Sequence, residues 1–116
     1  MKTIIAGSRG IANYEVVQEA IRESKFAITE VVSGGAVGVD YLGEEWSRKN
    51  NVRMTRFMPE WTTYGKAAGV IRNGQMAKYA QALIAIWDGK SRGTLNMIEQ
   101  ARSKGLKVYV KRVNLL

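Results

Sequence analysis

The chain has 116 residues, a length that suits one domain, and its 46% hydrophobic and 24% charged residues are the composition of an ordinary globular protein. It contains no cysteine and no histidine, which excludes disulfides, thiolate metal sites, a cysteine nucleophile, Ser-His-Asp catalysis and histidine acid–base chemistry. The net charge of +8 lies mostly in residues 59–116, whose 10 basic and 3 acidic side chains favour an anionic ligand or a polyanion.

Hydropathy gives an expectation about location. The longest apolar run, Ala82–Trp87, is far shorter than the roughly 20 residues that cross a bilayer. The first residues also lack the longer apolar stretch of a secretory signal. We therefore expect a cytoplasmic protein without a membrane partner.

Short apolar, β-branched runs alternate along the chain with segments of helical periodicity, such as Val16, Val17, Ala20 and Ile21. The predicted strands are Lys2–Ala6, Glu30–Ser33, Val52–Met58, Ala82–Trp87 and Leu106–Val110. The predicted helices are Tyr14–Ser24, Asp40–Lys49, Lys66–Ala80 and Thr94–Ser103, with a loop over Pro59–Thr63. This alternation predicts an α/β fold, in which residues 1–116 form a single Rossmann-like domain with a parallel sheet of about five strands flanked by helices.

Glycine-rich turns follow three of the predicted strands, and ligands of such sheets bind beyond the carboxyl ends of the strands. The first turn is Gly7-Ser8-Arg9-Gly10. Its glycines expose backbone amides to an anion, and Ser8 and Arg9 add side-chain donors. The alternative is a tight strand–helix connection with a solvated arginine.

The second turn, Ser33–Asp40, leads into a helix whose first amides would face a phosphate or carboxylate. It contains Gly34, Gly35 and Gly38, but it is not the dinucleotide fingerprint, since Ser33 stands where that motif needs glycine. Asp40 either caps the helix or contacts a ligand.

The third turn begins at Asp88 and contains Gly89-Lys90-Ser91, which resembles the end of a P-loop. The first P-loop glycine would fall on Ile84, inside a strand, so this is not a Walker motif. We expect Ser91, Gly93 and Thr94 to donate to phosphate oxygens at a helix start. Asp88 either accepts from ribose hydroxyls or binds its own backbone in a turn.

Aromatic and basic residues lie between the second and third turns. Trp61 and Tyr64 offer flat faces for a nucleobase, and Lys66 and Arg72 offer positive charge. Both aromatic residues are also suited to packing the loop onto the core. The methionines predicted to fill the core are Met54, Met58, Met76 and Met97.

Taken in order, these segments resemble the SLOG superfamily, the Rossmann-like group of the Lonely Guy phosphoribohydrolases and the DprA proteins, and more closely its small YspA/cpYpsA-related members. The matching segments are Ile5–Gly10, Ser33–Ala36 with Gly38–Asp40, Tyr64–Lys66 with Ala68–Gly69, Ile71–Asn73 with Met76, and Trp87–Gly89 with Ser91 and Gly93–Thr94. The resemblance implies a pocket for a nucleotide or nucleotide-derived ligand, and dimers or higher oligomers. The predicted ligand-binding residues are Gly7, Ser8, Arg9, Gly34, Gly35, Gly38, Asp40, Tyr64, Lys66, Arg72, Asn73, Asp88, Ser91, Gly93 and Thr94.

One departure from the Lonely Guy pattern concerns catalysis. In that branch, an arginine and a glutamate cleave a base–ribose bond, and Arg72 matches the arginine. Met97 stands at the glutamate position, and Glu99, two residues on, would face away from the pocket. A carboxylate normally stabilises the developing ribosyl cation, and here only Asp40, Asp88 or Glu60 would remain for that role.

We therefore predict a nucleotide-binding protein, a sensor or sponge of a nucleotide signal, that needs no metal or cofactor. The first alternative is an N-glycosidic hydrolase in which Arg72 is catalytic. The second is a DprA-like binder of single-stranded DNA, for which we expect only weak affinity.

Overall fold

Five parallel strands form one sheet in the order β3-β2-β1-β4-β5 in the computed structural model, which describes residues 1–114. The strands are β1 (Lys2–Gly7), β2 (Glu30–Ser33), β3 (Arg53–Arg56), β4 (Ala82–Trp87) and β5 (Lys107–Arg112). From β1 the chain adds β2 and then β3 on one side, and it then crosses over to add β4 and β5 on the other side of β1. This Rossmann-like architecture confirms the predicted fold class.

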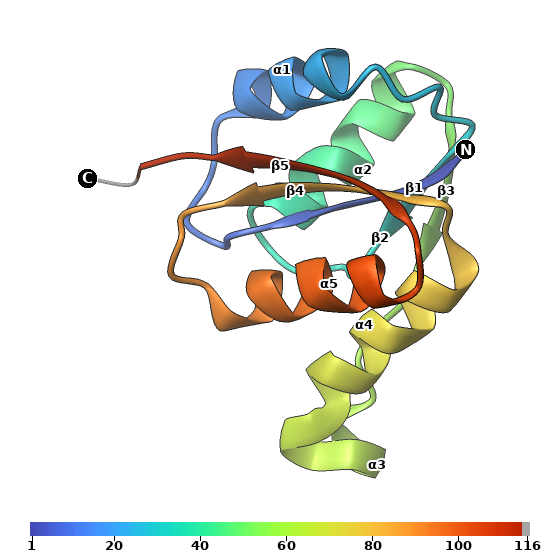
Figure 1. The fold of residues 1–116 in the computed structure, drawn as a ribbon, viewed down its shortest axis with the longest axis vertical. Helices are drawn as coiled ribbons and strands as arrows, with labels where there is room; N and C mark the ends of the chain where they lie inside the picture. Colours follow the sequence, from blue (N-terminus) through green and yellow to red (C-terminus); the bar gives the residue numbers. More distant parts are fainter. Residues whose placement is uncertain (115–116) are drawn as a thin grey trace.

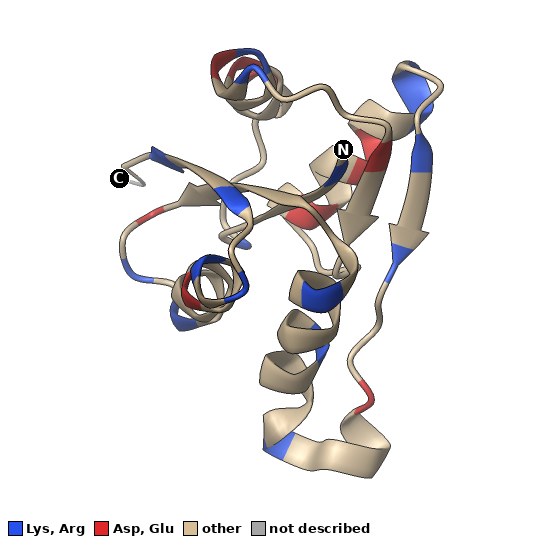
Figure 2. Cartoon of the chain, turned by 45° about the vertical axis from the view of Figure 1, so that its right-hand side comes forward, with Lys and Arg blue, Asp and Glu red and all other residues tan. Residues whose placement is uncertain are grey.

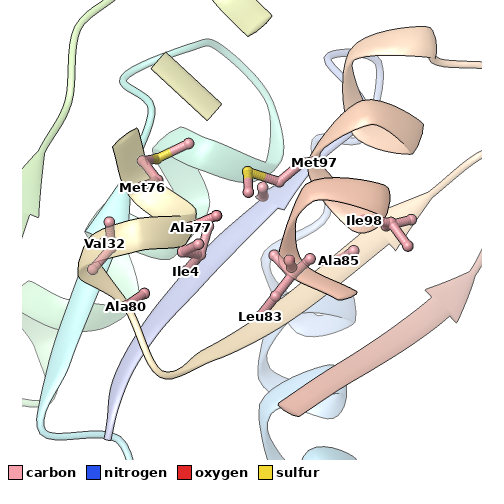
Figure 3. Packing of buried hydrophobic residues seen from close by; sticks show 11 residues of the cluster. Ile4, Val32, Met76, Ala77, Ala80, Leu83, Ala85, Met97 and Ile98 are labelled. Atoms are coloured by element: carbon pink, nitrogen blue, oxygen red, sulfur yellow. The ribbon is translucent and has the colours of Figure 1, made fainter. Parts of the chain in front are cut away.

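Helices cover both faces of the sheet (Figure 1). They are α1 (Tyr14–Ser24), α2 (Val39–Lys49), α3 (Trp61–Tyr64), the 3-10 turn η1 (Gly65–Ala67), α4 (Ala68–Tyr79) and α5 (Arg92–Ser103). Successive residues of a strand point to opposite faces, so Ile4 packs with α4 and α5 whereas Ile5 packs with α1 and α2. Figure 3 shows the first of these two cores, where Met76 and Met97 meet Ile4.

Three predictions between β3 and α4 are wrong. The segment Pro59–Thr63 is not all loop, because helix α3 begins at Trp61, and α4 begins at Ala68 rather than at residue 66. Met58 is not core filler, since β3 ends at Arg56 and the Met58 side chain is 57% exposed. The other predicted elements are present, and their ends differ from the predicted ones by at most two residues.

Two large-scale features bear on function. Figure 1 shows α3 and the first turns of α4 extending beyond the sheet, and Figure 2 shows basic positions on α4 and β5, two elements that contain no acidic residue. Within residues 1–114, no helix combines the length and apolarity needed to cross a membrane.

Glu30 closes the amino end of the sheet. Its buried carboxylate accepts hydrogen bonds from the Tyr79 hydroxyl and, at 2.8 Å, from Thr55 Oγ1. The ammonium group of Lys2 lies 4.1 Å from the centre of the Tyr79 ring. Burial opposes ionisation of this carboxyl, but the two hydroxyls and the nearby basic residues hold its pKa below the ordinary value.

Candidate functional site

A cavity of about 640 Å³ lies at the carboxyl ends of β1, β2 and β4, where the three glycine-rich turns meet α4. β1 stands at the reversal of strand order, the place where ligands bind in sheets of this kind. The predicted residues that line the cavity are Gly7, Ser8, Arg9, Gly34, Gly35, Asp40, Lys66, Arg72, Asn73, Asp88, Ser91, Gly93 and Thr94. The structure therefore gathers all but Gly38 and Tyr64 in one place.

The first turn is fixed by its contact with β4. A Cβ atom on Gly7 would lie 2.2 Å from the carbonyl oxygen of Ile86, so only glycine fits there. The buried Ser8 hydroxyl accepts the backbone N–H of Asp88 at 3.1 Å and so ties the first turn to the third. Arg9 is exposed at the mouth of the cavity.

The second turn is held by the ion pair between Glu44 and Arg56, to which Ser33 connects it. Ser33 Oγ accepts the N–H of Gly35 at 3.0 Å and donates to Glu44 Oε2 at 2.6 Å. Arg56 binds the same carboxylate through two nitrogens, at 2.9 and 2.6 Å. Glu44 is buried, and although burial opposes its ionisation, Arg56 and Ser33 keep its pKa below the ordinary value.

Gly38 has a structural role in this turn. It precedes α2 with φ +81°, and a Cβ atom there would lie 2.6 Å from the carbonyl oxygen of Arg9. It faces a smaller depression of about 240 Å³, lined also by Tyr41 and Leu42, rather than the main cavity. Glycine at this position lets the first and second turns pack backbone to backbone.

Asp40 lies inside the first turn of α2 and is not its cap, because Gly38 holds the cap position. Its side chain is turned toward the preceding loop, where Oδ2 accepts the N–H of Ala36 at 3.2 Å. The residue is only 6% exposed and lines the cavity wall. Burial raises the pKa of Asp40 to about 6, against the opposing effects of the Ala36 N–H, the Arg72 guanidinium and the Gly7 N–H.

Arg72 reaches the second turn from α4. Its Nη1 donates to the carbonyl oxygens of Gly34 at 2.5 Å and of Phe57 at 3.4 Å, and its Nε donates to Asn73 Oδ1 at 3.1 Å. All three acceptors are neutral, and none of the ion pairs found within residues 1–114 involves Arg72. Burial lowers the pKa of Arg72, which Asp40 partly offsets.

Asn73 is buried and joins α4 to the start of α5. Its Nδ2 donates to Asn96 Oδ1 at 3.0 Å and to the carbonyl oxygen of Gly93 at 3.3 Å. Since its Oδ1 accepts from Arg72, Asn73 orients the guanidinium as well as the α5 terminus.

The third turn is held by its own side chains. Asp88 Oδ1 accepts the N–H groups of Lys90 and Ser91, each at 2.8 Å, and these bonds lower its pKa. Asp88 therefore binds its own backbone in a turn, and its contact with a ribose stays a prediction. Ser91 caps α5, where its Oγ accepts from Thr94 N at 3.3 Å and from Thr94 Oγ1 at 3.0 Å.

The outer wall of the cavity is apolar. Met58, Trp61 and Val70 line it although each is more than half exposed. The sequence predicts Trp61 as a contact for a nucleobase, but it does not single out Met58 and Val70 as cavity residues, because their apolar character fits a core residue equally well. Tyr64 is exposed and does not line the cavity.

The inner wall lacks the glutamate of the hydrolytic pattern. Met97 is buried and lines the cavity, whereas Glu99 is exposed and outside it. Of the three remaining carboxylates, Asp40 and Asp88 line the cavity and Glu60 does not. No group of three acidic side chains within residues 1–114 is placed to hold a metal ion.

Comparisons with known proteins identify a family and relatives that this chain resembles in sequence or in fold. The profile of the YspA, cpYpsA-related SLOG family matches residues 1–64. The Gene 61 protein of Mycobacterium phage D29 is 30% identical over 117 residues, which cover 92% of this chain and 93% of the phage protein. The X-ray structure of DNA processing protein A (DprA) from Streptococcus pneumoniae superposes with a TM-score of 0.77 at 19% identity over 99% of this chain, which spans about half (51%) of that chain. The chain belongs to the YspA, cpYpsA-related SLOG family.

Proposed function

We propose that the cavity binds a nucleotide or a nucleotide-derived ligand, and that the protein acts in the cytoplasm as a sensor or sponge of a nucleotide signal. The observation that carries this proposal is the convergence of three glycine-rich turns with Arg9, Lys66 and Arg72 on one cavity. Backbone amides of such turns and arginine side chains are the groups that proteins use to bind phosphate. Family membership supports the same ligand class.

The two walls of the cavity suit the two parts of a nucleotide. The glycine turns and the Arg72 guanidinium form the inner side, whereas Met58, Trp61 and Val70 form the outer side. An aromatic ring and a thioether are favourable contacts for the face of a nucleobase. We therefore place the phosphate on the turns and the base against Trp61.

The proposal is tested by comparing the melting temperatures of the protein with AMP and with adenosine. We expect AMP to stabilise more, and Arg72→Ala to weaken AMP binding by about 1–3 kcal/mol, the loss of a charge-assisted hydrogen bond. Arg102→Ala removes an exposed arginine outside the cavity and serves as the control. Equal stabilisation by nucleosides and nucleotides across a panel of bases would contradict the proposal.

A second candidate, hydrolysis of an N-glycosidic bond, is favoured by the buried Asp40 carboxyl beside Arg72. Met97 opposes it, because a thioether neither stabilises a ribosyl cation nor activates water. We expect negligible release of base when the protein is incubated with nucleoside monophosphates and analysed by chromatography. Release that is lost in Arg72→Ala would replace binding by hydrolysis as the function.

Binding of single-stranded DNA is the remaining alternative, and the basic second half of the chain supports it. We expect weak binding that falls steeply with salt, since it would rest on phosphate contacts alone. A tight complex with an oligonucleotide near physiological salt would favour DNA as the ligand.

We also expect a homo-oligomer, a dimer or larger, which light scattering of the purified protein would test.

A further inference from the structure

Asp40 is the buried carboxyl of this cavity whose charge is least compensated. The residue is 6% exposed, its carboxylate accepts from two backbone N–H groups, that of Ala36 at 3.2 Å and that of Gly7, and no ion pair within residues 1–114 involves it. Asp88, by contrast, accepts two short hydrogen bonds from its own turn. A ligand on the second turn would therefore lie next to a buried carboxylate that belongs to no ion pair within residues 1–114.

Gly34 shows how close the two charged groups of this region lie. A Cβ atom on Gly34 would stand 2.6 Å from Arg72 Nη1 and 2.8 Å from Asp40 Oδ2. The guanidinium and the carboxylate thus both lie close to the same point beside the Gly34 backbone. An anion bound by Arg72 and by the amides of this turn would share that small volume with Asp40.

The charged groups around Asp40 do not cancel its charge. Arg72 approaches from α4 and favours the carboxylate, whereas Glu44, on α2 itself, disfavours it. Arg56 of β3 is engaged with Glu44, Asp88 lines the cavity after β4, and Arg9 and Lys66 lie on the exposed side. Two anions close together in a buried site do not both stay ionised, so one of them takes up a proton.

We propose that Asp40 makes anion binding proton-linked, so that the phosphate of the ligand enters the cavity together with one proton that resides on the Asp40 carboxyl. This inference rests on the proposed function and specifies which ligands the cavity prefers. The site favours ligands of low negative charge, or ligands that place a hydrogen-bond donor against Asp40. Asp40 is a ligand-contacting residue in this scheme. The raised pKa of the unoccupied carboxyl is consistent with it.

The test uses adenosine 5′-monosulfate, because its charge stays fixed over the range in which a phosphate group titrates, near about pH 6. Titration calorimetry at pH 7 in two buffers of different ionisation enthalpy measures proton uptake directly. We expect uptake of about one proton per ligand in the wild-type protein, and an affinity that falls about tenfold per pH unit above about 6. This measurement needs no variant.

Asp40→Asn removes one negative charge from inside the cavity, and the control Glu60→Gln removes one from outside it. We expect Asp40→Asn to abolish both proton uptake and pH dependence, with tighter binding at pH 7.5, and Glu60→Gln to preserve wild-type behaviour. If AMP binds but the sulfate ester takes up no proton or does not bind, the inference is overturned and the proposed function stands. If neither compound binds at any pH, both the inference and the proposed function are overturned.

Discussion

Glu30 and Asp40 are both buried carboxylic acids, one at the amino end of the sheet and the other at its carboxyl end. Glu30 accepts from two hydroxyls, and its pKa lies below the ordinary value. Asp40 accepts from backbone N–H groups, those of Ala36 at 3.2 Å and of Gly7, and burial raises its pKa to about 6. Burial opposes ionisation in both, so the difference lies in the partners that each receives.

The two carboxyl groups thus distinguish an end of the sheet where side chains stabilise the fold from the end that we propose binds a ligand. At the amino end, two hydroxyl groups donate to the Oε2 atom of the Glu30 carboxylate, as expected of a structural contact. The cavity end keeps a carboxyl and a guanidinium close to one another without pairing them. Groups held in this way are typical of functional sites, where they cost stability and act on a ligand.

The largest expected effect comes from Gly7→Ala. The added methyl group would overlap the carbonyl oxygen of Ile86 and the side chain of Val39, so β1, β4 and α2 would have to separate. Overpacking of this kind costs about 3 kcal/mol or more where backbone atoms are involved. Urea unfolding would measure it, and a variant as stable as the wild type would show that the first turn is not fixed by this contact.

Asp40→Asn should stabilise the protein at pH 7.5, by up to about 3 kcal/mol, because it removes the cost of ionising a buried carboxyl. The folded-state pKa of about 6 lies above the ordinary 3.8, so wild-type stability falls as the pH rises from about 4 through 6. The gain from the variant should therefore vanish below about pH 4. Unfolding midpoints measured across this range check the sign, and a destabilised variant at pH 7.5 would contradict it.

Glu30→Gln should have the opposite sign. It replaces a carboxylate that accepts from Tyr79 and Thr55, and we expect a loss of about 1–2 kcal/mol at neutral pH. Because the pKa of Glu30 is lowered, its contribution is present above about 4.5 and is lost as the pH falls through the folded-state value. The wild type and the variant should converge in acid, and a constant difference down to pH 2 would show that ionisation of Glu30 is unimportant.

Much of this architecture could be predicted from residue patterns. The apolar strands and the glycines after β1 and β2 are local signals, and they fix both the sheet and the place of the cavity. Helix α3 was missed because four residues, Trp61–Tyr64, are too few to show periodicity. The state of Asp40 was also beyond prediction, since it depends on Gly34 and Arg72, which come together only in the fold.

Gly93→Ala carries the smallest expected effect on stability and distinguishes a glycine required by the fold from one available to a ligand. Gly93 lies in the first turn of α5, and a Cβ atom there would meet nothing within 4 Å. Alanine is the better helix former, so we expect a gain of about 0.5 kcal/mol in the free energy of unfolding. If a phosphate approaches this backbone from the cavity, the added methyl group obstructs it and AMP affinity falls despite the higher stability. Unchanged AMP binding in a stabilised variant would indicate that the phosphate lies on the first and second turns alone and not at the start of α5.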